Sequence, residues 1–444
     1  MAKNKKKLNF QISTSNRYVI NNLYLANYRQ TYKTDIQTSY YNDAVKFFSD
    51  KDYFKSIEKF FYFLKNKNSE NVKFKTEESK LGFELIQGSN IIKCKCSANK
   101  FVAISNIYSF DVLSKELARE LLMINYNLQY CKFAIEKNTI LLKFEIPIYF
   151  AHPDYLYYAL KEMALNADKY DDLLCANFKY LNKINNLHII NYSKEILEKK
   201  LKYFKIWLKK SIVDFDKQDV NKMSGARTYI AMSTIFKIAF LLSPHGYLEE
   251  QLRKIILKYL NLSNNFLEFN VEVGNFLKNL SLMPDKNITE NFYITTYTFN
   301  PLESINNNQI LDFIRAEVNK IYTYEAMNKK LSNNKNIFEL NYVYDYIVGF
   351  IQYKWTIDEV WEELFQLYWE IRYSEYFEDF GVKYLPIENN KIKIFDVNFR
   401  IKNLNMIAKK KYKNFFFNPK HLNTSNIQDF FKSFFQNIII LNFS

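Results

Sequence analysis

The chain has 444 residues, enough to bury a large core and to form two or three domains. Hydrophobic residues make up 48% of it and aromatic residues 18%, which excludes an intrinsically disordered protein. The seven glycines and seven prolines are few for this length, so the composition favours long helices over an all-β fold with many tight turns.

The net charge of +15 raises the question of a nucleic-acid partner or an acidic membrane surface. The basic residues are almost all lysine, however, because only 8 of the 62 are arginine. Lysine, asparagine, isoleucine, phenylalanine and tyrosine are all abundant, as expected of codons from an AT-rich genome. Since readout of phosphates and bases favours the planar fork of arginine, the charge by itself does not indicate a nucleic-acid function.

The sequence predicts a reduced, cytoplasmic protein without membrane insertion. The basic residues 1–7 are not followed by the apolar run of a secretory signal. The longest apolar stretch, 230–242, is interrupted by Lys237 and is too short to span a bilayer. Neither redox spacing nor zinc-ligand spacing occurs among the four cysteines, Cys94, Cys96, Cys131 and Cys175.

Residues 1–38 are polar with weak periodicity and predict an N-terminal arm, which is followed by a domain at 39–180. The apolar spacing at the start of this domain predicts two short helices around a turn at 49–52. Alternation of apolar and polar residues between 72 and 110 then predicts three strands.

Residues 112–174 carry the clearest pattern in the chain and predict a helix, a hairpin and a second helix. Leu113, Leu117 and Leu121 recur at a spacing of four and give the first helix one apolar face. Pro153 opens the second helix at a position where its missing N–H costs nothing. We expect one buried sheet face beneath the second helix, with the strand residues Phe133, Ile135, Leu142, Phe144 and Ile146 packed against Leu156, Leu160 and Met163.

The predicted order between 53 and 175 is helix, three strands, helix, two strands, helix. Its motifs are a helix that ends on an asparagine at 121–125, strands at 133–136 and 142–147, and a closing helix at 160–174. This stretch resembles the type III secretion chaperone-like fold, and in particular the YbjN-type domain. The resemblance implies an α+β domain with a five-stranded antiparallel sheet and flanking helices. It also implies a protein-binding or chaperone-type module, and it supplies no active site.

A mainly α-helical region is predicted at 190–380 and a basic C-terminal segment at 381–444. The apolar spacing predicts helices at 193–210, 226–242, 247–260, 264–281, 307–331, 338–352, 356–378 and 427–438, with a strand-like stretch at 392–395.

Charge is distributed unevenly near the C-terminal end. Residues 355–380 carry a net charge of −7 (eight acidic, one basic), and residues 382–444 carry +8 (eleven basic, three acidic). The sequence therefore predicts that the basic segment packs onto the acidic helix, and binding of an external acidic partner is the alternative.

The chain contains no recognisable catalytic or cofactor motif. No two of its seven glycines lie within five residues of each other, which excludes the clustered-glycine loops that bind nucleotides. No two histidines share a helical turn and none has a cysteine at ligand spacing, so we expect no zinc site and no catalytic role at His152, His188, His245 or His421. Asp168 and Asp172 have a helical spacing that suits a divalent cation, but with Asp171 we expect them on a solvated helix face.

These observations favour a non-catalytic protein-binding adaptor or chaperone-type protein without cofactor or metal. The candidate protein-binding residues are apolar positions on two predicted helices: Leu113, Leu117 and Leu121 on one, and Trp355, Trp361 and Phe365 on the other. Packing in the core is the competing interpretation for Trp361 and Phe365, which share a helical face. A basic nucleic-acid-associated protein is the first alternative, and an enzyme of unrecognised type is the second.

The first helix of the stretch 112–174 also bears on assembly. Type III chaperone-like domains commonly pair, so the resemblance implies a homodimer as one arrangement. The apolar arc of the helix is wider than one sheet-facing stripe needs, because Leu122 and Ile124 join the leucines. Since the tethered helical region is already at high effective concentration, we expect it to cover this second face and to leave the chain a monomer.

Overall fold

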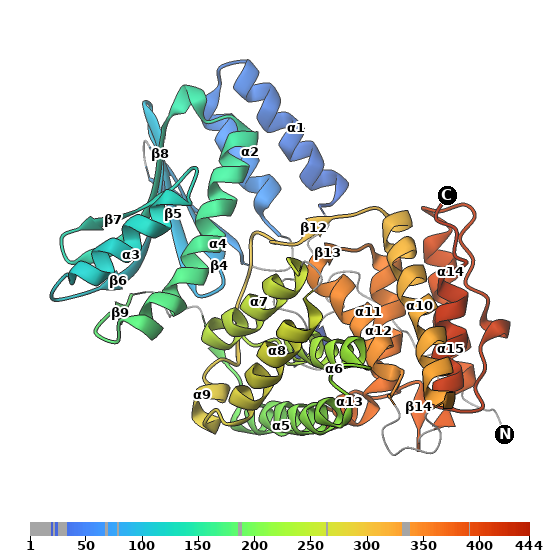
Figure 1. Ribbon diagram of the computed structural model, residues 1–444. Helices are drawn as coiled ribbons and strands as arrows, with labels where there is room; N and C mark the ends of the chain where they lie inside the picture. The colour runs from blue at the N-terminus through green and yellow to red at the C-terminus, as the bar shows by residue number, and fades with distance from the viewer. Residues whose placement is uncertain are drawn as a thin grey trace, which may run out of the picture.

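Two apolar cores organise the chain, one in a sheet domain and one in a helical region. The sheet domain lies on the left in Figure 1 and the helical region on the right, so the predicted α+β class with a helical C-terminal region is confirmed. The computed structural model describes residues 19–20, 23–24, 33–66, 70–77, 80–184, 189–262, 265–330, 338–389 and 391–444.

Two helices precede the sheet, as predicted. α1 (Asp35–Ser49) begins inside the predicted N-terminal arm, because the Thr34 side chain caps its first turn. Asp52 caps α2 (Tyr53–Leu64) by accepting a hydrogen bond from the Lys55 amide at 3.3 Å. Most of the predicted arm lies outside the described residues.

A seven-stranded antiparallel sheet follows, in the order β3-β4-β5-β6-β8-β7, with β9 also paired to β6. Its strands are β3 (Val72–Glu77), β4 (Lys80–Gln87), β5 (Asn90–Cys96), β6 (Lys100–Ser109), β7 (Lys132–Glu136), β8 (Thr139–Pro147) and β9 (Asn182–Lys183). The predicted number of five strands is therefore wrong. The prediction missed β3, where Lys73 and Lys75 weaken the apolar signal, and the two-residue β9. α3 (Lys115–Tyr126) accordingly follows the fourth strand of this sheet and not the third.

One face of the sheet packs beneath α4 (Pro153–Asn177), as predicted. The strand residues Phe133, Leu142, Phe144 and Ile146 are at most 8% exposed and share a core with the helix residues Leu156, Leu160 and Met163. The expected burial of Ile135 is wrong. This side chain is 39% exposed, because it lies on the edge strand β7 beside the turn at 137–138.

The helical region contains the helices predicted after residue 190 and two further helices, at 285–289 and 394–408, that were not predicted. Its helices are α5 (Lys194–Lys217), α6 (Ser224–Lys237) with a π turn (Ile238–Leu242), α7 (Gly246–Leu260), α8 (Phe266–Ser281), α9 (Asp285–Thr289), α10 (Asn307–Lys330), α11 (Asn341–Lys354), α12 (Glu359–Arg372), α13 (Ser374–Asp379), α14 (Ile394–Ala408) and α15 (Ile427–Ile438). The remaining short strands pair two by two: β1 (Val19–Ile20) with β2 (Leu23–Tyr24), β10 (Ile190–Asn191) with β11 (Tyr293–Ile294), β12 (Glu303–Ser304) with β13 (Trp355–Thr356), and β14 (Ile387–Glu388) with β15 (Lys391–Ile392).

The strand-like stretch predicted at 392–395 is confirmed only at Ile392, which ends β15, and is wrong at Ile394 and Phe395, which begin α14. The C-terminal segment also belongs to the core of the helical region and does not form a separate part. Arg400 of α14 forms ion pairs with Glu363 and Glu370, and Lys411 pairs with Asp358. The predicted packing of the basic segment onto the acidic helix is therefore confirmed for these two basic residues.

Among the described residues, one helix is long and apolar enough to cross a membrane by length and composition. It is Ser224–Leu242, formed by α6 and its π turn, and 83% of its apolar window is buried inside the protein.

Residues 295–299 tie the helical region to the sheet domain. The Gln87 side chain accepts hydrogen bonds from the amides of Thr298 (3.1 Å) and Phe299 (2.9 Å). The Phe299 side chain is 2% exposed and belongs to the core of the sheet domain. A single antiparallel bridge also pairs Gly88 with Thr296.

Candidate functional site

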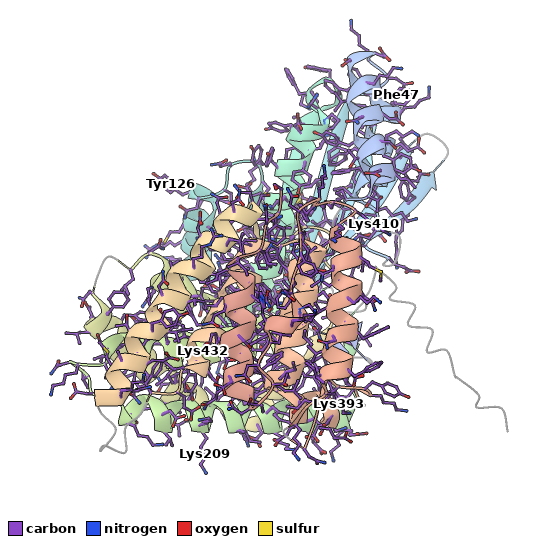
Figure 2. All side chains as sticks on the ribbon, turned by 90° about the vertical axis from the view of Figure 1, so that its right-hand side faces the viewer. Phe47, Tyr126, Lys209, Lys393, Lys410 and Lys432 are labelled. Carbon is purple, nitrogen blue, oxygen red and sulfur yellow. The ribbon has the colours of Figure 1, made fainter. Side chains whose placement is uncertain are left out.

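The side of α3 that faces away from the sheet carries exposed apolar residues. Leu117 and Leu121 point into the core of the sheet domain and are at most 5% exposed. On the opposite side, Leu122, Met123 and Tyr126 are 69%, 66% and 90% exposed, and we call these three residues the outer face of α3. Tyr126 projects from the surface in Figure 2.

The helical region does not cover the outer face of α3, so the expected packing of the two is wrong. Figure 1 places α3 at the edge of the sheet domain remote from the helical region. The helical region instead contacts the sheet domain at the end of β4, where residues 298–299 form hydrogen bonds with the Gln87 side chain. Leu113, which precedes α3, is 40% exposed.

The backbone of the neighbouring edge strand β7 is partly occupied. The Phe133 amide donates a hydrogen bond to Asn125 Oδ1 at 2.6 Å, and Asn125 Nδ2 donates to the Phe133 carbonyl at 2.9 Å. One side chain of α3 thus satisfies the outward backbone groups of Phe133, which an added strand would otherwise pair with. A partner at this surface therefore meets the side chains of α3 and a strand edge that is already partly occupied.

The second set of predicted protein-binding residues lies inside the helical region. Trp361 and Phe365 are fully buried, and Trp361 Nε1 donates a hydrogen bond to Asn307 Oδ1 at 2.8 Å. Trp355 is half-buried against Phe313, at 5.4 Å between ring centroids. Core packing, the competing interpretation, describes Trp361 and Phe365, and Leu117 and Leu121 likewise belong to a core.

A cavity of about 40 Å³ lies where α4 meets the helical region, lined among others by Asp168, Asp172, His245, Glu249, Arg253 and Tyr293. This volume holds roughly one or two water molecules. The predicted solvated face is therefore wrong, since the aspartates of α4 face a protein junction. The Ser89 amide donates to Asp168 Oδ1 at 3.0 Å, and Lys183 forms an ion pair with Asp172.

Burial at the junction between α4 and the helical region shifts the pKa values of three side chains. Burial, together with the nearby Asp171 carboxylate, raises the pKa of Asp168 well above its usual range. Burial and the Asp172 carboxylate raise the pKa of Asp171, whose Oδ1 atom has no hydrogen-bond partner among the described residues. Burial lowers the pKa of His245 to about 3, so this imidazole is neutral at physiological pH.

On the helical side of the junction, the contacts of His245 are made within the helical region. The neutral His245 ring forms a hydrogen bond with the Tyr297 hydroxyl at 2.7 Å and stacks on Tyr293. Within the part of the chain that the structure describes, no group of three His, Cys, Asp or Glu residues is arranged to hold a metal ion. Ser89, Lys183 and Tyr293 come from separate segments, so no local sequence pattern predicts that they lie close together.

The other histidines predicted to have no catalytic role lie elsewhere. His152 caps α4 by accepting a hydrogen bond from the Asp154 amide at 3.3 Å. His421 is exposed and contacts Asn418. His188 lies outside the described residues.

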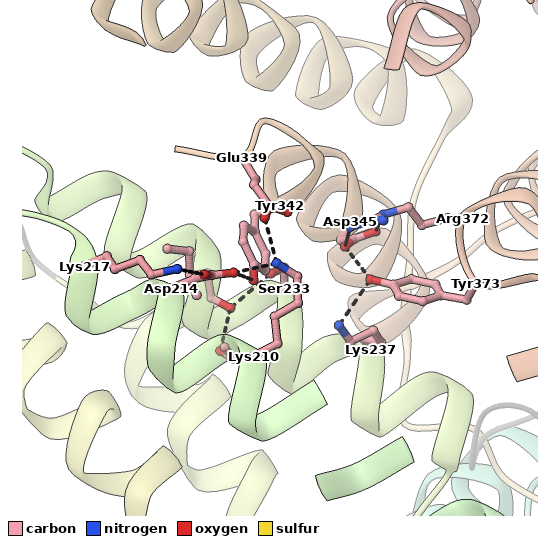
Figure 3. A network of polar contacts seen from close by, with 12 residues as sticks. Lys210, Asp214, Lys217, Ser233, Lys237, Glu339, Tyr342, Asp345, Arg372 and Tyr373 are labelled. Carbon is pink, nitrogen blue, oxygen red and sulfur yellow. Dashed lines mark hydrogen bonds and ion pairs between the residues drawn. The ribbon is translucent and has the colours of Figure 1, made fainter. Parts of the chain in front are cut away.

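A second polar network joins α6, α11 and α12 inside the helical region (Figure 3). Asp345 is almost fully buried and accepts hydrogen bonds from the hydroxyls of Tyr368 (2.6 Å) and Tyr373 (2.5 Å). Lys237 Nζ donates to the Tyr373 hydroxyl at 3.2 Å, and Arg372 forms an ion pair with Asp345. Burial lowers the pKa of Lys237 to about 7. These contacts orient three core helices relative to one another.

No protein-family model matches this chain, and no curated protein matches it either.

Proposed function

We propose that the chain is a non-catalytic protein-binding adaptor whose partner docks on the outer face of α3. The observation that carries this proposal is the exposure of three large apolar side chains on one helix, each between 66% and 90% exposed: Leu122, Met123 and Tyr126. Single exposed apolar residues are ordinary on protein surfaces, whereas a cluster on a fixed element is typical of an interaction site.

α3 presents this cluster in a fixed orientation. The Ser114 side chain caps its start by accepting a hydrogen bond from the Leu117 amide at 3.1 Å. Leu117, Leu121 and Ile124 anchor its inner side in the core. A preformed surface of this kind binds without a cost for ordering the helix.

The composition of the outer face of α3 suits a protein partner. Tyrosine and methionine are enriched in interfaces, and the flexible methionine side chain adapts to an opposing apolar surface. Arg119 is exposed one turn before Met123 and supplies a charged rim. Because Asn125 occupies the strand edge, we expect an amphipathic helix of the partner rather than an added strand.

A chaperone-type role is the finer form of this proposal. What supports it is the order of α2, sheet strands, α3, a hairpin and α4, which is the helix order that the resemblance to type III secretion chaperone-like domains implies. The additional strand β3 and the long helical region depart from the implied pattern, so the partner-binding surface has to be tested on the full chain.

Crosslinking from α3 tests the adaptor proposal. We expect a photoreactive residue at position 123 of the full-length protein to capture one partner protein from native lysate. The double substitution Leu122→Lys with Tyr126→Lys should abolish the capture, because two charges then oppose an apolar surface.

The matched control is Leu257→Lys with Val271→Lys, which makes the same charge change at positions on α7 and α8 that are 42% and 60% exposed. The control should retain the partner. Equal capture by the α3 variant and the control, or a captured protein that is only a second copy of this chain, contradicts the adaptor proposal.

A further inference from the structure

α14 has two apolar faces, and only one of them is covered. Val397, Ile401, Leu404 and Ala408 are at most 3% exposed in the core of the helical region. The opposite side carries a stripe at successive spacings of four, three, four and three residues: Phe395, Phe399, Lys402, Met406 and Lys409. Phe395, Phe399 and Met406 are 79%, 46% and 55% exposed. Such spacing keeps the stripe on one side of the helix along its whole length.

The surroundings of this stripe are strongly basic. Residues 391–420 contain nine basic residues and one acidic residue, a net charge of +8. Three of the nine pair with carboxylates: Lys393, Arg400 and Lys411. The other six form no ion pair with a described residue: Lys391, Lys402, Lys409, Lys410, Lys413 and Lys420. The Lys409 ammonium lies 5.7 Å from the ring centre of Phe416, which is 53% exposed.

We propose that the exposed stripe of α14, together with Phe416, docks on an anionic membrane surface. Figure 2 shows the face that carries α14, with Lys393 and Lys410 at the two ends of the helix. Phenylalanine and methionine side chains that project from a helix enter the boundary between headgroups and acyl chains, while long lysine side chains reach back to the phosphates. The positive charge of 391–420 complements anionic headgroups.

The geometry favours a membrane over a nucleic acid. The stripe runs along the outside of a helix about 22 Å long, at 1.5 Å per residue, and a raised surface of this kind suits a flat bilayer. Single-stranded nucleic acids are instead held in a basic groove with bases stacked on aromatic rings. Arg400, the one arginine between 391 and 420, is turned inward to Glu363 and Glu370, so its planar fork is not available to a phosphate beside the exposed stripe.

Vesicle flotation with the full-length protein tests the proposal. We expect it to float with vesicles of phosphatidylcholine and phosphatidylglycerol but not with vesicles of phosphatidylcholine alone. Removing three charges by Lys409→Gln, Lys410→Gln and Lys413→Gln should weaken binding roughly a hundredfold, since each lysine near an anionic surface contributes about fivefold. Phe395→Ser with Phe399→Ser should abolish flotation at physiological salt while leaving the melting temperature unchanged, because both rings are solvent-exposed.

Matched controls separate this stripe from general surface charge and exposed apolar area. Lys179→Gln, Lys209→Gln and Lys222→Gln remove the same charge elsewhere on the surface, and Val271→Ser with Leu282→Ser removes apolar groups that are 60% and 80% exposed. All control variants should float like the wild type. The proposal is overturned if the wild type does not float with anionic vesicles or if the controls lose as much as the α14 variants. It is equally overturned if a single-stranded oligonucleotide binds more tightly than the vesicles and requires the same phenylalanines and lysines.

Discussion

Away from the aspartates of α4 at the junction, the sheet domain and the helical region differ in where the polar groups that are hardest to satisfy are found. In the sheet domain these groups are backbone amides and carbonyls on the edge strand β7, where Asn125 satisfies the outward groups of Phe133. In the helical region they are charged side chains in the interior. Lys200 and Lys237 are 0% and 5% exposed, and each amine lies over aromatic rings.

The difference follows from how the two architectures satisfy the backbone. A sheet leaves unpaired backbone groups along its outer strands, so it needs protection at its rim. Helices satisfy most of their backbone internally, and their packed side chains enclose lysine stems when aromatic rings and carbonyls receive the amine. Lys200 shows this arrangement, because its Nζ donates a hydrogen bond to the Leu242 carbonyl at 2.5 Å between the rings of Tyr192 and Phe292.

The sheet domain should be most sensitive to a charge placed in its apolar face. Leu142→Asp buries a carboxylate without a partner, and we expect it to lower the free energy of unfolding by about 4 kcal/mol or more. Urea unfolding followed by circular dichroism measures the change. The control Ile135→Asp lies on the adjacent edge strand at a residue that is 39% exposed, and it should cost less than about 1 kcal/mol. Equal losses from the two variants would show that the assigned buried face is wrong.

The helical region should instead make the free energy of unfolding depend on pH. Burial lowers the pKa of Lys237 to about 7, whereas the unfolded chain keeps the ordinary value near 10.5. Between these two values the unfolded state binds a proton that the folded state does not, so the free energy of unfolding rises with pH in this window. Lys237→Met should reduce that rise by at most about 1.4 kcal/mol per pH unit, the limit for one proton.

Chemical unfolding at several pH values between about 7 and 8.5 checks this expectation. At higher pH the buried cysteines and tyrosines oppose the rise, because burial raises their pKa values and the unfolded chain then loses protons that the folded chain keeps. Lys200 has a pKa lowered to about 7 by burial as well and should preserve part of the slope in the variant. Lys209→Met, at an exposed position on α5, is the control and should leave the slope unchanged. A slope that is the same in the wild type and Lys237→Met would mean that Lys237 stays protonated in the folded state.

Local periodicity predicted the sheet domain better than the helical region. The alternation of Leu142, Phe144 and Ile146 identified one face of a strand correctly, because the side-chain period of a strand directly reflects burial. β3 was not predicted because only two of its six residues, Val72 and Phe74, are apolar, which makes its alternation too short to mark a separate strand. The identification of the chaperone-like fold family stays a prediction.

Pattern reasoning failed where a helix has two apolar faces. Phe395 and Phe399 on one side of α14 and Val397 and Ile401 on the other cancel the helical signal, so the start of the segment resembles a strand. The apolar spacing of Val397, Ile401, Leu404 and Ala408 does indicate a helix, but the prediction did not use it. The junction at Asp168 was beyond sequence reasoning for a different reason, since its partners come from segments far apart in the chain.

The smallest expected effect concerns the rim of the sheet. Asn125→Ala removes both hydrogen bonds to the Phe133 backbone, and we expect a loss of about 1 kcal/mol because water can reach the freed groups at an edge strand. Hydrogen exchange measured by mass spectrometry on peptides that cover residues 132–136 should become faster. Asn127→Ala, which removes one exposed contact to the Met123 carbonyl, should leave that exchange unchanged. If exchange at 132–136 is the same in Asn125→Ala and the wild type, the edge of β7 is protected by something other than Asn125, and strand addition becomes an available mode of partner binding at this surface.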